Sequence, residues 1–368
     1  MSGFNINTTT DEITHDCNTK ESNFLTTSEQ DNTDNINGED LPSINNNKNE
    51  YKDIENECDL YKIDEFDELE IQDELLRGIY SYGFEHPSVI QRKAIKPIIL
   101  GKDLIAQSQS GTGKTGSFLI GAMARVDLKC KKPQVLVLCP NRELAHQIFY
   151  NFEALNQYTK IKGGLIMGGT GVEDNFKILD DGCQFIIGTP GRVYDMMKRY
   201  VLKTSELKTF VMDEADEMLS RGFKDQIYEI FQFISEKCQI CIFSATMPEL
   251  ALEITDKFMN NPLKILIKTE MITLEGIKQY YLGIEQESWK VATLYDLYDR
   301  LRIRQTIIFV NSKRKAEYLK EQLESQNFVV SIIHANMNQM QRDKTMKTFR
   351  TGSSRILIAT DVIARGID

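Results

Sequence analysis

The sequence lacks the features that mark secreted and membrane proteins. No apolar run approaches the ~20 residues that a helix needs to cross a bilayer. The first residues, MSGFNINTTTDE, have no basic start followed by an apolar core, as a secretory signal would. The seven cysteines follow no spacing typical of a disulfide framework. We therefore expect a soluble intracellular protein with no membrane partner, in either the cytoplasm or the nucleus.

A closely spaced cysteine pair occurs at Cys238-x-x-Cys241. A zinc or redox site would need a second pair or an exposed turn, and the sequence shows neither. The pair lies in CQICIFSAT, which has the apolar, β-rich character of a buried strand. Thiols pack there as small hydrophobic groups, so we predict that both cysteines are structural.

The net charge of −10 is unevenly distributed. Residues 1–60 carry 14 acidic and 3 basic side chains, a local charge of −11, which leaves about +1 for the remainder. Bulk charge therefore neither requires nor excludes an RNA partner. The same segment holds 12 asparagines and few large apolar residues. It cannot bury enough surface to offset its ordering entropy, so we predict a disordered acidic tail over 1–60.

From residue 61, short apolar runs of β character alternate with segments of helical spacing such as Ile227, Ile230, Phe231 and Ile234. This alternation predicts an α/β fold with parallel sheets covered on both faces. A break near residues 262–275 separates two series, so we predict a domain over 61–265, a linker over 266–275 and a second domain over 276–368. The first series is DLIAQS, PQVLVLCP, GGLIMGG, QFIIGTP, TFVMDEAD, ICIFSAT and LKILIK, and the second is IKQYYLGIE, QTIIFVN, VVSIIHA and RILIATD.

A phosphate loop is indicated by SGTGKT, which follows a predicted strand and opens a predicted helix. Its glycines allow backbone N–H groups to turn toward phosphates. Lys114 would neutralise the β and γ phosphates of ATP, and the Thr115 hydroxyl would ligate Mg²⁺. The strict pattern has glycine where this chain has Ser108, so a glycine-rich turn is the alternative. The loop residues assigned to the nucleotide are Ser110, Gly111, Thr112, Gly113, Lys114 and Thr115.

Asp213 and Glu214 follow the apolar strand TFVM. Asp213 is predicted to hold Mg²⁺ through water, because this ion keeps part of its hydration shell. Glu214 is predicted to orient or deprotonate the attacking water. An isolated Asp-Glu pair is usually a solvated surface, but with Lys114 upstream the three residues form the predicted catalytic set of an ATPase.

These motifs, with GFEHPSVIQ, PNRELA, TPGR, SAT and ARGID in the same order, resemble the DEAD-box RNA helicases, most closely the eukaryotic initiation factor 4A group. The likeness covers residues 61–368. It implies two RecA-like domains and an RNA-dependent ATPase that separates short duplexes. It also implies a monomer that works with protein cofactors of translation initiation or of the exon-junction type. LSRGFKDQIY and GSSR resemble the translation factor, whereas SQS before GTGKT favours the exon-junction branch.

The resemblance also assigns roles to individual residues. Phe84 would stack on adenine and Gln91 would bond its edge, although a packing phenylalanine and a capping glutamine are the alternatives. Asp368 would contact the ribose. Contacts to the RNA backbone rather than to base identity are implied for nine residues, and coupling of nucleotide state to RNA for three more. The former are Arg142, Gly168, Gly169, Thr189, Gly191, Arg192, Asn311, Arg314 and Thr360, and the latter are Asp216, Ser244 and Thr246.

Three departures from the family pattern bear on activity. Asn141 replaces a threonine, although its amide can still donate to phosphate, and HANM replaces His-Gly-Asp-Met. The family's H-R-x-G-R-x-x-R motif, whose arginines reach the γ phosphate, does not occur before Asp368. We therefore expect an incomplete second domain and a truncated reading of a complete helicase. The alternatives are an ATP-dependent RNA clamp or a natural short form that binds ATP without efficient turnover.

Overall fold

The computed structural model describes residues 60–220, 222–247, 249–267, 278–301 and 303–363. We call residues 60–267 the first lobe and 278–363 the second lobe. The predicted tail up to residue 59, most of the predicted linker and Asp368 lie outside the described residues. Within the described ranges, no helix has both the length and the apolar character needed to span a membrane.

The first lobe is built on a seven-stranded sheet in which every pair of neighbouring strands is parallel. Each of its strands coincides with one of the seven predicted apolar runs, although β6 begins one residue before its run, at Gln239. The strands are ordered β3-β4-β2-β5-β6-β1-β7 across the sheet. Their bounds are β1 Leu104–Gln107, β2 Val135–Leu138, β3 Gly163–Ile166, β4 Phe185–Gly188, β5 Thr209–Asp213, β6 Gln239–Ser244 and β7 Leu263–Leu266.

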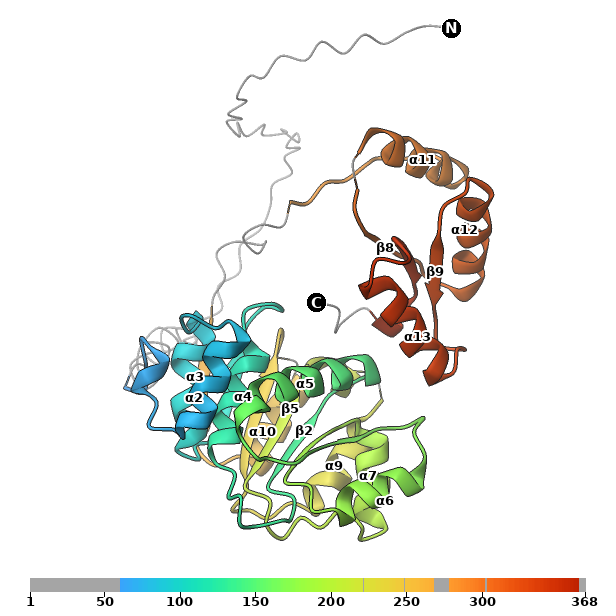
Figure 1. Cartoon of the computed structure of the whole chain (residues 1–368). Coiled ribbons are helices and arrows are strands. Elements are labelled where there is room, and N and C mark those ends of the chain that lie inside the picture. The colour runs from blue at the N-terminus through green and yellow to red at the C-terminus, as the bar shows by residue number, and fades with distance from the viewer. Residues whose placement is uncertain (1–59, 221, 248, 268–277, 302, 364–368) are drawn as a thin grey trace, which may run out of the picture. The chain divides into compact units, whose positions relative to one another are not determined.

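Helices cover both faces of this sheet (Figure 1). The elements α2 to α5 pack on one face and α6 to α10 on the other. The predicted helical spacing is confirmed for Ile227, Ile230 and Phe231, which are buried on α9, whereas Ile234 follows the end of that helix. The bounds are η1 Phe66–Glu68, α2 Asp73–Tyr82, α3 Val89–Ile99, α4 Lys114–Ala124, α5 Arg142–Leu155, η2 Asn156–Tyr158, α6 Val172–Asp180, α7 Pro190–Lys198, α8 Ala215–Ser220, α9 Lys224–Gln232 and α10 Glu249–Phe258.

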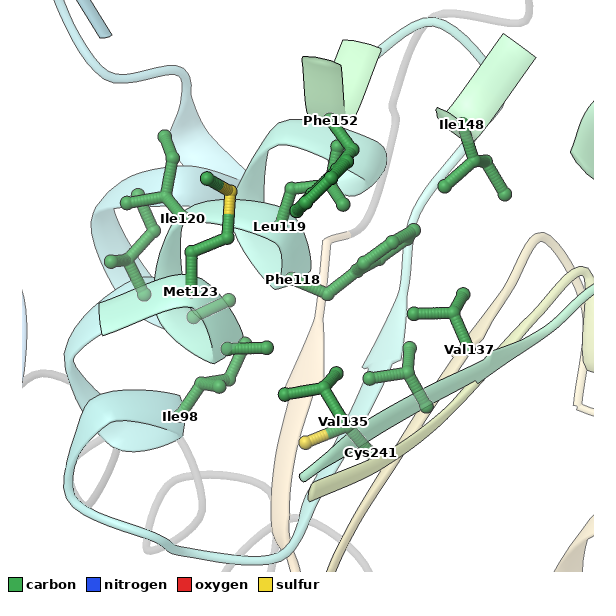
Figure 2. Close-up of a cluster of buried hydrophobic side chains, with 14 of the residues drawn as sticks. Ile98, Phe118, Leu119, Ile120, Met123, Val135, Val137, Ile148, Phe152 and Cys241 are labelled. Atoms are coloured by element: carbon green, nitrogen blue, oxygen red, sulfur yellow. The ribbon is translucent and has the colours of Figure 1, made fainter. Parts of the chain in front are cut away.

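Strand side chains alternate between two hydrophobic clusters. Val135 and Val137 of β2 join the cluster under α2 to α5, while Leu136 and Leu138 join the opposite one. Figure 2 shows part of the first cluster, including Phe118 of α4. Because both faces of β2 are buried, this strand is apolar at every position, which is the pattern of a parallel strand between helical layers.

The second lobe has a smaller sheet of the same kind, with strands in the order β8-β10-β9 and all pairs parallel. Leu357 and Ala359 of β10 pack in one cluster with α13, and Ile356 and Ile358 pack in another with α12. The α/β prediction therefore holds for both lobes. The elements are η3 Glu287–Trp289, α11 Lys290–Arg300, β8 Thr306–Phe309, α12 Lys313–Ser325, β9 Val330–Ile333, α13 Gln339–Arg350, β10 Ile356–Ala359 and η4 Asp361–Ile363.

One predicted strand is wrong. The run IKQYYLGIE has no strand over its described residues 278–285. Tyr280 and Tyr281 are largely exposed there. A strand exists only where its backbone bonds to a neighbour, and among the described residues the second sheet ends at β8 and β9. Alternation of apolar residues alone did not show whether a partner strand was present.

The buried-strand prediction for the cysteine pair is confirmed. Cys241 lies within β6, and Cys238 directly precedes it, both buried. Burial raises the pKa of Cys238 to about 12 and that of Cys241 further still. Both thiols are therefore held in the protonated, unreactive form at neutral pH.

Candidate functional site

The predicted site residues of the first lobe lie along one edge of its sheet. Parallel strands end at a common edge, and each motif follows the carboxyl end of a strand. SGTGKT follows β1, PNRELA follows β2, Gly168-Gly169 follows β3 and TPGR follows β4. Asp213 ends β5 and Ser244 ends β6. Given the strand order, residues assigned to RNA occupy one half of the edge and the phosphate loop the other, with DEAD and SAT between them.

The phosphate loop is shaped by two glycines with left-handed backbone. Gly111 has φ 79° and Gly113 has φ 100°, values that L side chains rarely adopt. A Cβ on Gly113 would lie 2.7 Å from Ser88 Oγ and 2.9 Å from Gln91 Nε2, so the loop is also closely packed from behind. Thr112 Oγ1 donates to the Gln109 carbonyl at 2.8 Å. The loop is thus held open by conformation and fixed by packing.

Lys114 begins α4 and is only 5% exposed. Its ammonium donates to the Ser108 carbonyl at 2.8 Å and lies 3.7 Å from Glu214 Oε1. A buried ammonium requires anionic or carbonyl partners. The side chain is therefore directed into the loop, at the N-terminus of α4, where the helix dipole also favours an anion.

Asp213 and Glu214 lie opposite the loop. Asp213 is 2% exposed, and its Oδ1 accepts the Glu214 N–H at 3.0 Å. Glu214 has φ 53°, a left-handed conformation for a residue with a side chain. Strain of this kind concentrates at functional sites. Thr115, Asp213 and Glu214 line a single hollow with Gly111 and Lys114, so the predicted metal and catalytic residues come together.

The adenine prediction divides into two parts. Phe84 lines the same hollow. Gln91 is 2% exposed; its Oε1 accepts the Ser88 N–H at 2.8 Å, and its Nε2 donates to the Gly113 carbonyl at 3.4 Å. In this structure Gln91 is thus the capping residue of α3 and a brace for the loop, which was the alternative interpretation. The direct bond to adenine stays a prediction.

The residues assigned to coupling are in direct contact. Thr246 Oγ1 donates to Asp216 Oδ2 at 2.7 Å, and the Asp216 N–H donates to Ser244 Oγ at 3.3 Å. The Ser244 carbonyl in turn accepts the Ser108 N–H at 3.1 Å. A continuous chain of bonds therefore runs from the phosphate loop through SAT to DEAD. Its role in signalling nucleotide state stays a prediction.

Arg142 lies against the paired glycines. A Cβ on Gly169 would be 2.4 Å from Arg142 Nη1, and one on Gly168 would be 3.1 Å from Nη2. Burial lowers the pKa of Arg142, but an arginine stays charged under all ordinary conditions. Asn141 caps α5 by accepting the Leu144 N–H at 2.7 Å. Its buried Nδ2 has no hydrogen-bond partner among the described residues, which leaves a donor at the predicted RNA edge.

Arg192 is held by neighbouring backbone. Both of its terminal nitrogens donate to the Thr170 carbonyl, at 3.2 and 3.1 Å, and one also bonds the buried Asn175 side chain. Thr189 occupies the N-cap position of α7, with Gly191 in the first turn of that helix. Arg142, Gly168, Thr189, Gly191 and Arg192 line a common recess. The structure thus brings the first-lobe RNA candidates together.

Comparison with known proteins agrees with this geometry. Residues 88–254 match the model of the DEAD/DEAH box helicase family, and residues 289–368 match the helicase conserved C-terminal domain. The chain is 53% identical over 306 residues to the ATP-dependent RNA helicase eIF4A of Chaetomium globosum, covering 83% of this chain and 77% of that protein. The Mycosarcoma maydis eIF4A is also 53% identical, with 83% and 74% covered.

The chain belongs to the DEAD/DEAH box helicase family, within the eIF4A group of ATP-dependent RNA helicases. Solved structures support the same assignment. Saccharomyces cerevisiae Dbp5 bound to RNA and ADP BeF3 superposes with a TM-score of 0.76 at 37% identity, covering 83% of this chain and 78% of that one. A DEAD box protein from Methanococcus jannaschii gives 0.55 at 33% identity, with 83% of each chain covered.

In the second lobe of this DEAD-box protein, the predicted RNA residues again follow strands. Asn311 and Arg314 lie just beyond β8, both exposed, and Thr360 follows β10. The HANM turn forms with the Met337 N–H donating to the His334 carbonyl at 3.2 Å. All three predicted contacts therefore lie at the carboxyl edge of the second sheet, matching the arrangement in the first lobe.

Sequence reasoning missed several residues that build the helicase site. Tyr82, Gln147 and Asn151 line the nucleotide hollow beside Phe84. These residues lie on α2 and α5, and no motif in the sequence marks them as functional. Ser88 could have been found, because S-x-x-Q before an apolar run is the signature of a capping box, and here it also donates to the Thr112 carbonyl at 2.8 Å.

Proposed function

We propose that this helicase hydrolyses ATP with Mg²⁺ in the first lobe and couples hydrolysis to sequence-independent RNA binding and local duplex separation. The observation that carries the proposal is the strand order. β1 brings the phosphate loop, β5 and β6 bring DEAD and SAT, and β2, β4 and β3 bring the RNA candidates. Nucleotide, coupling and RNA residues thus follow one another along a single sheet edge, and hydrogen bonds join the phosphate loop to SAT and DEAD.

The residues fit a magnesium nucleotide. Gly111 and Gly113 shape a loop into which no Cβ could be placed at Gly113 without displacement, and the α4 N-terminus lies behind it. Thr115 offers a hydroxyl and Asp213 a carboxylate, the oxygen ligands that Mg²⁺ prefers. The bound ion would neutralise charge on the phosphates and fix their geometry.

Three side chains of this chain then have distinct tasks. Lys114 would exchange its internal carbonyl and carboxylate partners for the β and γ phosphate oxygens. Glu214 lies across the same hollow, where its carboxylate would accept a proton from the attacking water. Asp213, fixed by the Glu214 N–H, would hold the metal hydration shell.

RNA recognition would use contacts to the sugar-phosphate backbone of the RNA. Arg142 and Arg192 supply guanidinium groups and Asn141 an unpartnered amide donor, while Gly168 and Gly169 permit close approach. Guanidinium groups, an amide donor and glycines suit contacts with phosphate and sugar, so binding would be independent of sequence. We further propose that the chain acts as a monomer with protein cofactors of the translation-initiation type.

The test is RNA-stimulated phosphate release. The full chain should release phosphate faster with single-stranded RNA than without it. Lys114→Ala should abolish release, while Lys237→Ala, an exposed lysine away from the hollow, should not change it. Equal rates with and without RNA would contradict the coupled function, and activity retained in Lys114→Ala would contradict the assigned site.

A further inference from the structure

A basic surface lies far from the motifs that follow the strands of the first sheet. It is a groove of about 650 Å³, which we call the lysine groove. Its walls come from the loop before β2, the α6–β4 turn and the segment after α7. These three segments lead into β2, β4 and β5, which are neighbours in the sheet. The groove therefore opens at the amino-terminal edge, opposite the nucleotide and RNA edge.

The groove has an excess of positive charge that its own acidic residues neutralise only in part. Lys131, Lys177 and Lys203 are exposed and form no ion pair with any described carboxylate, whereas Lys132 lies 3.3 Å from Glu206. Asp180 and Asp181 also line it, so the four lysines outnumber the two acids. Unpaired lysines that converge on a concave surface attract a polyanion.

The floor of the groove is closely packed. Gly182 has φ 88°, and a Cβ on it would lie 3.1 Å from Lys131 Cβ and 3.3 Å from the Lys131 carbonyl. The turn between α6 and β4 thus lies directly against the loop that carries Lys131. The backbone that carries Lys131 is therefore held against the end of α6 by close packing.

Tyr200 is the unusual residue of the groove. It occupies the position after the α7 cap, where its N–H donates to the Met197 carbonyl at 2.8 Å and the Val201 N–H donates to the Met196 carbonyl at 3.0 Å. This is the bonding of a Schellman motif, which normally has glycine at that position. Tyr200 has φ 57° and is 78% exposed. A strained aromatic residue that buries little of its side chain has no evident role in stability.

We propose that the lysine groove binds single-stranded RNA, with a base stacked on Tyr200 and phosphates held by Lys131, Lys177 and Lys203. An exposed ring among unpaired lysines suits a nucleotide, which offers a flat base and an anion together. An acidic peptide would satisfy the lysines but would leave the ring without a matching partner. This inference rests on the proposed RNA function. It adds a contact for RNA molecules long enough to extend beyond the carboxyl edge of the first sheet, where the motifs lie.

The experiment compares RNAs of about 10 and about 40 nucleotides, because only the longer strand can occupy both edges. In the wild type the long RNA should bind more tightly than the short one. Lys131→Glu/Lys203→Glu and Tyr200→Asn should each weaken long-RNA binding by about tenfold. For the lysine pair, the slope of log K against log salt should fall by about 0.7 per lost phosphate contact.

Two controls separate this inference from the proposed function. Lys160→Glu/Lys237→Glu changes the same charge in other exposed loops of the amino-terminal edge and should leave long-RNA binding within about twofold. ATPase activity with saturating short RNA should be unchanged in every groove variant. A wild type without RNA-stimulated ATPase would contradict the proposed function, whereas intact stimulation with unaltered long-RNA binding in the groove variants would overturn the groove alone.

The rival occupant is the acidic segment 1–59 of this chain. Photocrosslinking from a benzophenone placed at Lys203 in the full chain, with long RNA present, should label RNA. Labelling of residues 1–59 in place of RNA would overturn the proposal. Tyr200→Asn guards against misfolding, because asparagine tolerates the left-handed conformation better than tyrosine.

Discussion

At the scale of single residues, Glu214 shows how chemistry and backbone strain coincide. It carries a Cβ yet holds φ 53°, and its carboxylate is nearly buried beside the Lys114 ammonium. Such a conformation costs about 1–2 kcal/mol for a residue other than glycine. The Asp213 carboxylate compensates in part by accepting the strained residue's N–H. The same bond thus stabilises the turn and orients both acids.

Replacing Glu214 by glutamine should separate binding from turnover. The amide is nearly isosteric and keeps the backbone, but it cannot accept a proton from water. Single-turnover hydrolysis should slow by about 10²–10⁴, while binding of a fluorescent ATP analogue changes by a few-fold at most. Glu206→Gln, on the exposed side of the lobe, should behave as the wild type. A hydrolysis rate near that of the wild type in Glu214→Gln would exclude Glu214 as the base.

Gly169→Ala should weaken RNA binding through Arg142. The added Cβ would meet Arg142 Nη1 at 2.4 Å, so the guanidinium must move. Gly352→Ala is a matched control: Gly352 also has positive φ, 74°, but nothing lies within 4 Å of its Cβ position. Both variants should lose about 1 kcal/mol of unfolding free energy in urea titrations. Only Gly169→Ala should lower affinity for short RNA, and equal losses in both would refute the contact.

At the scale of elements, the end of α7 carries backbone strain, because Tyr200 occupies a left-handed position that favours glycine. Tyr200→Gly should raise the free energy of unfolding by about 0.5–1 kcal/mol, because glycine adopts the left-handed position without strain. Lys198→Gly, two residues earlier within the helix, should instead lower it by about 1 kcal/mol. Urea denaturation of the two variants measures both changes. Destabilisation by Tyr200→Gly would show that the ring contributes packing to the groove.

The elements were largely predictable because each strand has a mainly apolar centre. All seven runs of the first lobe correspond to strands, since a sheet covered on both faces favours apolar residues on both sides of each strand. The order of those strands was not predictable, because it depends on which helix covers which face. The segment 278–285 failed for a related reason: its pattern suits a strand, but its pairing depends on a neighbour elsewhere in the chain.

The site was predictable to the extent that its motifs follow strand ends. Lys114 and Asp213 could be placed together from the sequence because parallel strands share an edge. The hydrogen-bond partners of individual side chains could not be predicted. The Gln91 side chain accepts the Ser88 N–H at the start of α3, and the Arg192 guanidinium donates to the Thr170 carbonyl. Hydrogen bonds of this kind depend on angstrom-scale distances between loops, which residue spacing does not encode.

At the scale of the whole molecule, buried thiols should limit stability at alkaline pH. Burial raises the pKa of Cys183 and of Cys238 to about 12, against about 8.5 in an unfolded chain. The folded state therefore keeps protons that the unfolded state loses. This stabilising term is complete below the unfolded pKa and declines as pH rises from there toward about 12.

We expect the free energy of unfolding to fall by about 1–2 kcal/mol per such thiol between about pH 8 and about pH 10. Urea titrations at both pH values measure the change. Cys183→Ala/Cys238→Ala should show a smaller decline over that interval, whatever its stability at neutral pH. An identical decline with and without the two thiols would show that other groups control the alkaline limit.

The position of β1 has a consequence for biosynthesis. β1 is paired on one side with β6 and on the other with β7, so residue 104 pairs with residues 241 and 263. A nascent chain synthesised at about 5–20 residues per second must therefore hold β1 without either partner for roughly 7–27 s. During that interval its apolar side chains and both hydrogen-bonding edges are open to other chains. The strand that carries the phosphate loop is thus the one that we expect to depend most on chaperones during translation.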